Sequence, residues 1–216
     1  MKEEHPDRRD EEDVSQSAVD RLNPHQRLLY DTVISHWEES LNLDSYGYDA
    51  PRHRQLLLQV DGRGGTGKSY TLKVISAAIR RLSIAHGLQH SVLEKAASTG
   101  VAAYTIGGQT IHSLLRLPVT TAGDLPELTI GEATNIRRRL QHLEYLILDE
   151  KSMIGVRLFN YIDRRMRQIF ENDLYFGGRN MILLGDFHQL PPVLQQPLFR
   201  DVGSLRDPRD KAGRMA

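Results

Sequence analysis

The sequence predicts an α/β domain with a mostly parallel sheet that is covered by helices on both faces. Four short apolar runs are typical of strands, and helical patterns lie between them. A glycine-rich loop follows the first run, and two adjacent acids end the third. Ligands of such sheets bind at the carboxyl ends of the strands, so both features belong to one edge. The predicted strands are residues 56–60, 92–98, 145–148 and 181–184.

The first predicted helix begins in the stretch LNPHQRLLY. Asn23 can cap this helix, and Pro24 suits its first turn because proline needs no amide partner there. Apolar residues then recur at helical spacing in this segment and in two later ones, where they predict buried faces. These stripes are Leu29, Val33 and Trp37; Leu72, Ile75, Ile79 and Leu82; and Leu158, Ile162, Met166 and Ile169.

Composition divides the chain into a folded part and two charged ends. Residues 1–20 carry eight acids and three bases and almost no large apolar residues, which predicts a disordered acidic N-terminus. Residues 21–200 are predicted to form the folded domain, with surface loops at 45–54 and 117–133. The segment 201–216 has little apolar content, so we expect a disordered tail.

The overall charge is balanced, with 28 basic and 28 acidic residues, so it gives no support to nucleic-acid binding. The acidic N-terminus leaves a net charge of +5 on residues 21–216, which is compatible with DNA but not diagnostic. The chain has no cysteine, which excludes disulfides and cysteine metal sites and agrees with a reducing compartment. No apolar stretch has the length of a membrane span, and the N-terminus is unlike a signal peptide, so we expect an intracellular protein without membrane attachment.

The glycine-rich loop at residues 62–69 reads GRGGTGKS and matches the phosphate-loop pattern G-x-x-x-x-G-K-[ST] between a strand and a helix. Glycines let backbone N–H groups converge on a phosphate, and the helix that follows points the positive end of its dipole at the anion. Lys68 would reach the β- and γ-phosphates of ATP, and Ser69 would offer its hydroxyl to Mg²⁺. The alternative is a flexible turn before an ordinary helix. The predicted phosphate-binding residues are Gly62, Gly64, Gly65, Thr66, Gly67, Lys68 and Ser69.

The stretch LEYLILDEKSM ends an apolar strand on Asp149 and Glu150. In a phosphate-loop ATPase the first acid holds Mg²⁺, usually through water, and a second carboxylate can orient and deprotonate the attacking water. We therefore assign Asp149 to the metal and Glu150 to the water. The alternative is a pair of acids that merely ends a strand.

Two glutamines are further candidates. Gln189, in the stretch LLGDFHQLPPV, can both donate and accept a hydrogen bond, which suits a sensor of the γ-phosphate and the attacking water. Alternatively, Asp186 and Gln189 satisfy a turn before the two prolines. Gln26 could pair with the N6 and N7 edge of adenine, or it could be a solvated residue on a helix surface.

Taken together, the stretches GRGGTGKS, STGVAAYTIGGQTIHSLL, LILDEKSM and FGGRNMILLGDFHQLPPV resemble the petite-integration-frequency (Pif) family of superfamily 1 DNA helicases, which includes the helicases of Helitron transposons. The similarity runs from residue 22 to residue 193. It implies a RecA-like motor domain that hydrolyses Mg-ATP and moves 5′ to 3′ on single-stranded DNA. Roles in DNA repair, recombination or telomere maintenance follow from the same resemblance, as does a nuclear location in a eukaryote, with the mitochondrion as a second possibility.

The resemblance also assigns roles to single residues. It implies that Gln26 reads adenine and that Gln189 couples the ATP state to the grip on DNA. A DNA path would run along a set of hydroxyls and backbone N–H groups, for which the alternative is a polar helix start. The residues on this path are Thr99, Gly100, Thr110, His112 and Ser113.

The sequence departs from the family pattern in three respects. Glu94 and Lys95 lie in a predicted strand that would normally be apolar, and Lys151 follows the acid pair where many relatives have an apolar residue. The family also has a second motor domain that supplies arginines to the γ-phosphate, which we expect to be missing from this chain. A nucleotide-gated module that binds single-stranded DNA without unwinding it is therefore the main alternative. An unrelated phosphate-loop ATPase or kinase is the third.

Overall fold

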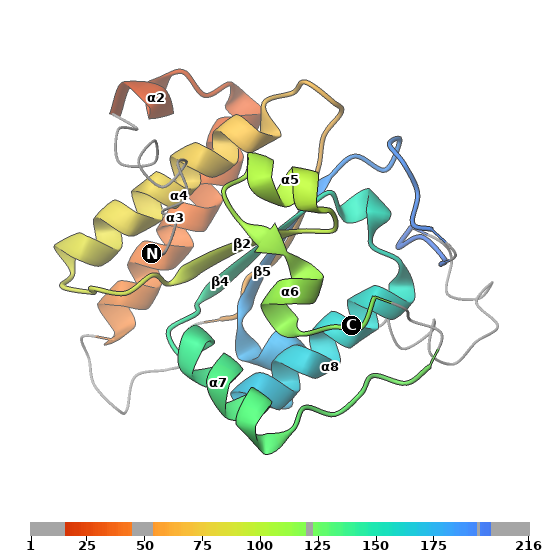
Figure 1. Ribbon diagram of the computed structural model, residues 1–216. Coiled ribbons are helices and arrows are strands. Elements are labelled where there is room, and N and C mark those ends of the chain that lie inside the picture. The colour runs from red at the N-terminus through yellow and green to blue at the C-terminus, as the bar shows by residue number, and fades with distance from the viewer. Residues whose placement is uncertain (1–15, 45–53, 120–122, 194, 200–216) are drawn as a thin grey trace, which may run out of the picture.

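A five-stranded parallel sheet forms the middle layer of the structure (Figure 1). The computed structural model describes residues 16–44, 54–119, 123–193 and 195–199. The order of the strands across the sheet is β1-β5-β4-β2-β3, so β5, the last strand in the described residues, lies between β1 and β4. The strands are β1 (Leu57–Asp61), β2 (Leu93–Ala97), β3 (Gln109–Thr110), β4 (Tyr145–Asp149) and β5 (Asn180–Gly185).

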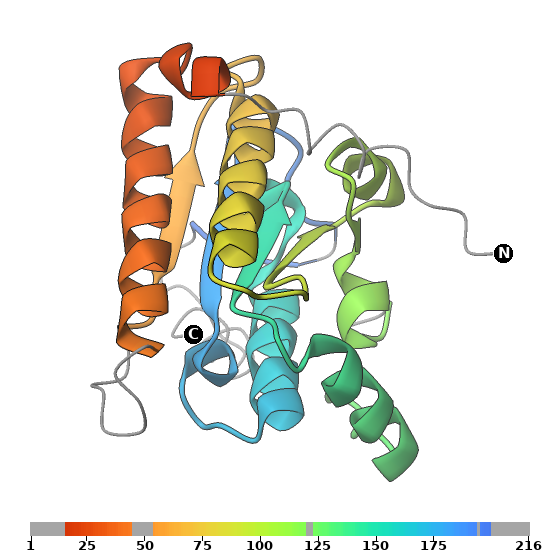
Figure 2. The same cartoon turned by 90° about the vertical axis from the view of Figure 1, so that its left-hand side faces the viewer.

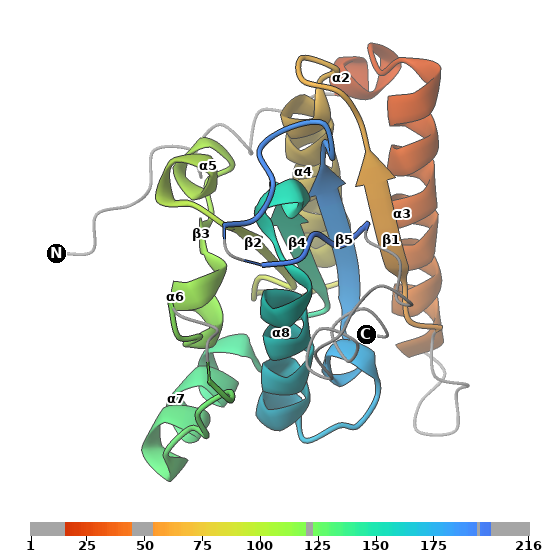
Figure 3. The ribbon, with the colours of Figure 1, turned by 90° about the vertical axis from the view of Figure 1, so that its right-hand side faces the viewer.

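Helices cover both faces of this sheet. The α-helices are α2 (Gln16–Asp20), α3 (Pro24–Asp44), α4 (Lys68–Ala85), α5 (Gly100–Thr105), α6 (Ile111–Leu115), α7 (Ile130–Leu140) and α8 (Val156–Phe170). The short 3₁₀ helices are η1 (Lys151–Met153) and η2 (Tyr175–Gly178). Figure 2 shows α3 and α4 side by side along one face, and Figure 3 shows α8 on the opposite face with α6 and α7 beside it.

Strand β4 shows how the two faces are filled. Tyr145 and Ile147 pack into the core under α3 and α4, whereas Leu146 and Leu148 pack into the core under α6, α7 and α8. Successive side chains of a strand point to opposite faces, so a strand that is buried on both sides must be apolar throughout. This is why β4 and β5 appear in the sequence as continuous apolar runs.

Most predicted elements are confirmed. All four predicted strands form within one or two residues of their expected bounds. The helix at Pro24 starts where its capping signals predicted, and a helix follows the glycine-rich loop as the phosphate-loop pattern predicted. Glu94 and Lys95 do lie in β2, opposite Leu146 and Ile147 of β4. Strand β3 pairs only with the last two residues of β2, so these charged residues lie on a stretch with a strand neighbour on one side only.

Two expectations about irregular segments are wrong in part. Residues 16–20, predicted to be disordered, form α2, in which Val19 is only 2% exposed and packs with α3 and α4. Residues 130–133, predicted as loop, form the first turn of α7, where Thr129 and Glu132 make a reciprocal capping box. The pattern Thr-x-x-Glu in the sequence is the signal for this helix start. The many turn residues that precede it led to the loop prediction for the whole segment.

The remaining segment predictions lie largely outside the described residues. These are the disordered stretch over residues 1–15, the surface loop over 45–53 and the tail over 201–216. No helix in the described part of the chain is long and apolar enough to cross a membrane.

Truncation of Ile147 to alanine should test the layered core. This side chain is fully buried at the centre of β4, so its loss leaves a cavity that the packed helices cannot fill, at a cost of about 2–5 kcal/mol. The control is Leu28→Ala on α3, where the side chain is 66% exposed and the change should stay within about 0.5 kcal/mol. Urea unfolding followed by circular dichroism measures both. Equal unfolding midpoints for the two variants would contradict the predicted core.

Candidate functional site

The glycine-rich loop joins the carboxyl end of β1 to the amino end of α4. Gly65 and Gly67 have φ values of 75° and 81°, which side chains with a Cβ rarely adopt. Gly67 caps α4, and a Cβ added there would lie 2.5 Å from the Nε2 atom of Gln26. The loop therefore has the backbone geometry that a phosphate loop needs, with its N–H groups at the start of a helix.

Lys68 lies folded onto the loop. Its ammonium donates hydrogen bonds to the carbonyl oxygens of Gly62, at 2.5 Å, and Arg63, at 3.0 Å. The hydroxyl of Thr66 donates to the same carbonyl of Arg63 at 2.8 Å. In this conformation the side chains of Lys68 and Thr66 both donate to carbonyl groups of the loop itself.

The two predicted acids lie together at the end of β4. Asp149 is buried, and one of its carboxylate oxygens accepts a hydrogen bond from the backbone N–H of Glu150 at 2.9 Å. Burial raises the pKa of Asp149, although this N–H and the charge of Lys68 act in the opposite direction. Burial and the neighbouring charge of Asp149 raise the pKa of Glu150. A carboxylate with a raised pKa accepts a proton more readily, as a general base must.

The backbone of Glu150 is unusual, with φ 58° and ψ 43° in the left-handed region. A residue with a Cβ is strained there by about 1–3 kcal/mol, and such strain clusters at functional sites. This conformation turns the chain from β4 into η1.

The turn after β5 contacts the glycine-rich loop. The carboxylate of Asp186 accepts hydrogen bonds from the backbone N–H groups of His188, at 2.9 Å, and Gly64, at 3.1 Å. The His188 N–H is the main cause of the lowered pKa of Asp186. The backbone N–H of Gln189 donates to the Asp186 carbonyl, and its side-chain amide lies 3.4 Å from where a Cβ of Gly64 would be. Asp186 thus forms a turn and also ties that turn to the loop.

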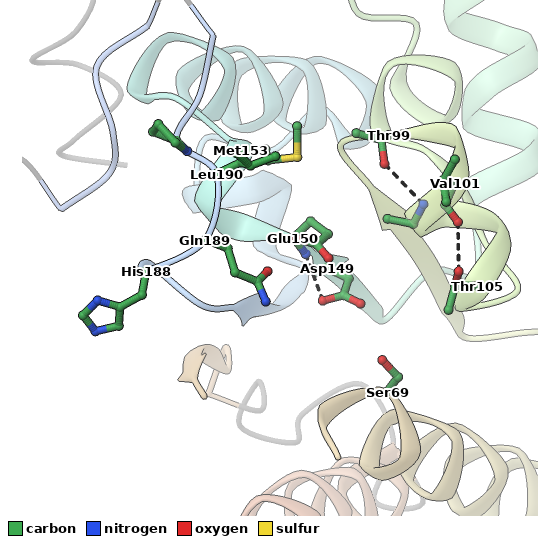
Figure 4. Close-up of a pocket in the computed structure, with 12 residues that line it drawn as sticks. Ser69, Thr99, Val101, Thr105, Asp149, Glu150, Met153, His188, Gln189 and Leu190 are labelled. Carbon is green, nitrogen blue, oxygen red and sulfur yellow. Dashed lines mark hydrogen bonds between the residues drawn. The ribbon is translucent and has the colours of Figure 1, made fainter. Parts of the chain in front are cut away.

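A pocket of about 900 Å³ opens at this edge of the sheet (Figure 4). Figure 4 shows Ser69 on one side, with Asp149, Glu150 and Gln189 facing it across the opening and α5 at the flank. The structure therefore brings these four predicted site residues together, with Thr99 beside them. The full lining is Ser69, Thr99, Val101, Ala102, Thr105, Asp149, Glu150, Met153, His188, Gln189, Leu190 and Pro191.

Ser69 and Asp149 are the predicted metal-binding pair, and both line the pocket. Within the described segments no three His, Cys, Asp or Glu side chains gather into a protein-only metal site. Mg²⁺ does not require such a cage, because it is held by one or two protein oxygens together with phosphate oxygens and water. A hydroxyl and a carboxylate on one pocket fit that mode.

Gln26 is engaged at both ends of its amide. Its oxygen accepts a hydrogen bond from the backbone N–H of Asn23, and its nitrogen donates to the carbonyl of Thr66, each at 3.0 Å. The side chain of Asn23 in turn accepts from the backbone N–H of Gln26, which completes a capping box at the start of α3. Gln26 therefore lies against the glycine-rich loop. Its role in reading adenine stays a prediction.

The predicted DNA-path residues begin two short helices. Thr99 caps α5 by accepting from the Ala102 N–H, and Thr110 caps α6 by accepting from the Ser113 N–H, both at 3.2 Å. These contacts match the alternative interpretation, a polar helix start. Gly100 is the first residue of α5, and burial lowers the pKa of His112, which favours its neutral form. DNA contact by these five residues stays a prediction.

The surroundings of Lys151 were not predicted from the sequence. This lysine follows Glu150 directly, and its side chain is completely buried. Its ammonium lies 3.2 Å from the carboxylate of Asp61 and 2.9 Å from the carbonyl of Val60. Nothing in the periodicity of the sequence reveals these contacts, because they join the start of η1, just after β4, to β1, and these two strands are not neighbours.

Comparison with known proteins gives a consistent result. The family model described as PIF1-like helicase matches residues 43–201. Among curated proteins, the chain is 37% identical over 137 residues to the ATP-dependent DNA helicase RRM3 of Saccharomyces cerevisiae, covering 62% of this chain and 18% of that protein. It is 34% identical over 141 residues to the human ATP-dependent DNA helicase PIF1, covering 64% of this chain and 21% of that protein.

Solved structures agree. Bacteroides Pif1 bound to ssDNA matches with a TM-score of 0.52 and 30% identity, covering 74% of this chain and 33% of that chain. The Pif1 helicase from Candida albicans matches with a TM-score of 0.55 and 26% identity, covering 80% of this chain and 34% of that chain. The chain thus spans about a fifth of the length of these curated relatives and about a third of these solved chains.

The raised pKa of Asp149 predicts that its charge destabilises the fold. A carboxyl whose pKa is higher in the folded state than in the unfolded chain costs stability above its folded pKa, and the cost fades as the pH falls toward its unfolded pKa of about 4. We therefore expect Asp149→Asn to raise the thermal unfolding midpoint at pH 7 in buffer without metal or nucleotide, with a smaller gain at pH 5.

Asp31→Asn is the matched control, since Asp31 is half-exposed on α3 and pairs with Arg27. This change should not raise the midpoint, because an exposed ion pair contributes little. A lower midpoint for Asp149→Asn at pH 7 would contradict the prediction.

Proposed function

Because the chain belongs to the PIF1-like helicase family, we propose that it forms the nucleotide-binding part of an ATP-dependent DNA helicase. One observation carries the proposal: Ser69 at the end of the glycine-rich loop, the acid pair and Gln189 line a single pocket at the carboxyl edge of a parallel sheet. Three segments far apart in the sequence supply these groups. Phosphoryl transfer needs positioned cations, a carboxylate and a γ-phosphate sensor. The pocket lining supplies the carboxylates and the candidate sensor, and Lys68, which precedes Ser69 in the chain, is the candidate cation.

In this proposal the triphosphate lies along the loop between Gly62 and Ser69. Lys68 exchanges its two carbonyl contacts for phosphate oxygens, and Gly64 releases Asp186 so that its N–H can face the nucleotide. Ser69 and Asp149 would hold Mg²⁺, which would supply positive charge to neutralise the phosphate oxygens. Glu150, with its raised pKa, orients the attacking water and takes its proton.

Gln189 is proposed to sense the γ-phosphate. Its amide lies close to Gly64, and its backbone belongs to the turn that runs on to Leu190 and Pro191 at the pocket wall. A change in contact at Gln189 can therefore move a segment that faces α5. Single-stranded DNA is proposed to run past α5 and α6, where Thr99, Gly100, Thr110, His112 and Ser113 begin the two helices.

The wider biology rests on the likeness to helicases. The names of the relatives support DNA unwinding as the reaction of the whole protein. A 5′ to 3′ direction of movement is proposed from the resemblance of the sequence motifs to the Pif family. Roles in repair, recombination or telomere maintenance, and a nuclear or mitochondrial location in a eukaryote, are proposals of the same kind. ATP turnover with and without single-stranded DNA tests the core claim. Binding of nucleotide and DNA without stimulated turnover would favour the nucleotide-gated module instead.

Lys68→Ala should weaken nucleotide binding by about tenfold to a hundredfold, because a charge-assisted hydrogen bond is worth about 1.5–3 kcal/mol. Titration with a fluorescent ATP analogue measures this change. The control is Lys73→Ala on the same helix, outside the glycine-rich loop, which should leave affinity within about twofold. Equal affinities for wild type and Lys68→Ala would remove the central claim.

Glu150→Gln should keep ATP affinity near normal and lower turnover by about 10²–10⁴, because an amide keeps the shape of the carboxylate but cannot take a proton. Asp149→Asn should instead weaken the dependence of nucleotide binding on Mg²⁺ concentration. Phosphate release and Mg²⁺ titrations of binding distinguish the two. The reverse pattern would show that the roles of the acids are exchanged.

A further inference from the structure

Lys151 makes three contacts in a completely buried position. Its ammonium donates to the Val60 carbonyl at 2.9 Å, pairs with the Asp61 carboxylate at 3.2 Å, and lies 4.4 Å from the centre of the Phe187 ring. A buried ammonium needs partners for its charge, and a carbonyl, a carboxylate and a ring face are suitable ones.

This side chain crosses a whole strand to reach its partners. Lys151 follows β4, whereas Val60 and Asp61 end β1, and β5 lies between the two strands. The crossing passes over Gly185, the last residue of β5, where an added Cβ would lie 2.8 Å from Cγ of Lys151. Any residue other than glycine at 185 would therefore collide with the lysine stem.

The three contacts join the parts of the proposed ATPase site. Val60 and Asp61 lead directly into the glycine-rich loop, and Phe187 lies between Asp186, which holds the Gly64 N–H, and Gln189. Lys151 itself follows Glu150 in the chain. The ammonium therefore connects the end of β1, which leads into the loop, with the turn at residues 186–189, which we call the sensor turn. Through its own backbone, Lys151 is also joined to the acid pair.

Stability alone does not account for a lysine at this place. Asp61 is 53% exposed, so water can solvate its carboxylate without the lysine. Replacement of a buried ion pair by apolar side chains of similar size is often neutral or stabilising. The positive charge of Lys151 is thus better explained by the relative positions of β1 and the turn at residues 186–189, which its contacts fix.

We propose that Lys151 is a positioning residue for ATP hydrolysis, which holds the glycine-rich loop and the sensor turn in register with Asp149 and Glu150 across strand β5. The inference rests on the proposed ATPase function. Positional errors on the scale of 1 Å can cost about a hundredfold in rate, so loss of the ammonium should lower turnover more than it lowers stability.

The test compares Lys151→Met with wild type in the 216-residue chain. Methionine keeps the length and apolar character of the stem but removes the charge. We expect kcat for ATP hydrolysis to fall by about tenfold or more, with a smaller change in KM and an unchanged thermal unfolding midpoint. In the nucleotide-free chain, amide hydrogen exchange should speed up in residues 61–65 and 186–189 and stay unchanged in α8.

Two further variants complete the set. Lys73→Met, on α4 and outside the pocket lining, is the matched control and should change neither turnover nor exchange. Asp61→Asn changes only the half-exposed partner and leaves the buried lysine side chain in place. It therefore replaces Lys151→Met in the test if that variant fails to fold. It should raise exchange in the same two segments.

Wild-type turnover and exchange in Lys151→Met would overturn the proposal. So would a fall in the unfolding midpoint with faster exchange across the whole sheet, which would mean that the residue is merely structural. If the wild-type chain neither binds nor hydrolyses ATP, the proposed function fails. The exchange pattern then still decides whether Lys151 holds the two segments, because that measurement uses no nucleotide.

Discussion

The insertion of β5 between β1 and β4 is the constraint on which the site depends. The glycine-rich loop leaves β1 and the acid pair ends β4, but these strands do not touch. Strand β5 pairs with both, Leu184 lying opposite Val60 and Leu183 opposite Leu148, so the register of β5 sets the level of each strand end. A slip of one residue would also turn every side chain of β5 to the wrong face. Strand β5 thus fixes the distance between the glycine-rich loop and the acid pair.

The sequence predicted the parts of this arrangement that depend on local patterns. Strands buried on both faces must be apolar throughout, so β4 and β5 were visible as continuous runs. The loop motif and the acid pair were visible because phosphate and metal chemistry demand particular residue types at short spacing. Parallel strands bring their carboxyl ends to one edge, which predicted that these groups meet there. The order of the strands across the sheet followed from none of these signals.

What the sequence did not reveal depends on long-range contacts or on elements too short to leave a pattern. Strand β3 has two residues and helix α2 has five, so neither is long enough for an apolar pattern to repeat several times. Gln26 and Thr66 are forty positions apart, and Lys151 and Val60 are ninety-one apart, yet each pair is hydrogen bonded. Lys151 was visible in the sequence as an unexpected charge after the acids. Its partners on β1 could be identified only from the structure.

The hydrogen bonds of the loop also affect how nucleotide can act on the rest of the site. Lys68, the Gly64 N–H and the Gln26 amide are all bonded to protein groups. On the proposed function, phosphate binding exchanges these bonds for new ones, so the net gain in free energy is far smaller than the number of new contacts suggests. The exchange at Gly64 has a further effect, because its present partner Asp186 also shapes the turn that leads to Gln189. Nucleotide binding and the position of that turn are therefore linked through one N–H group, and the turn forms the pocket wall opposite α5, which begins the proposed DNA path.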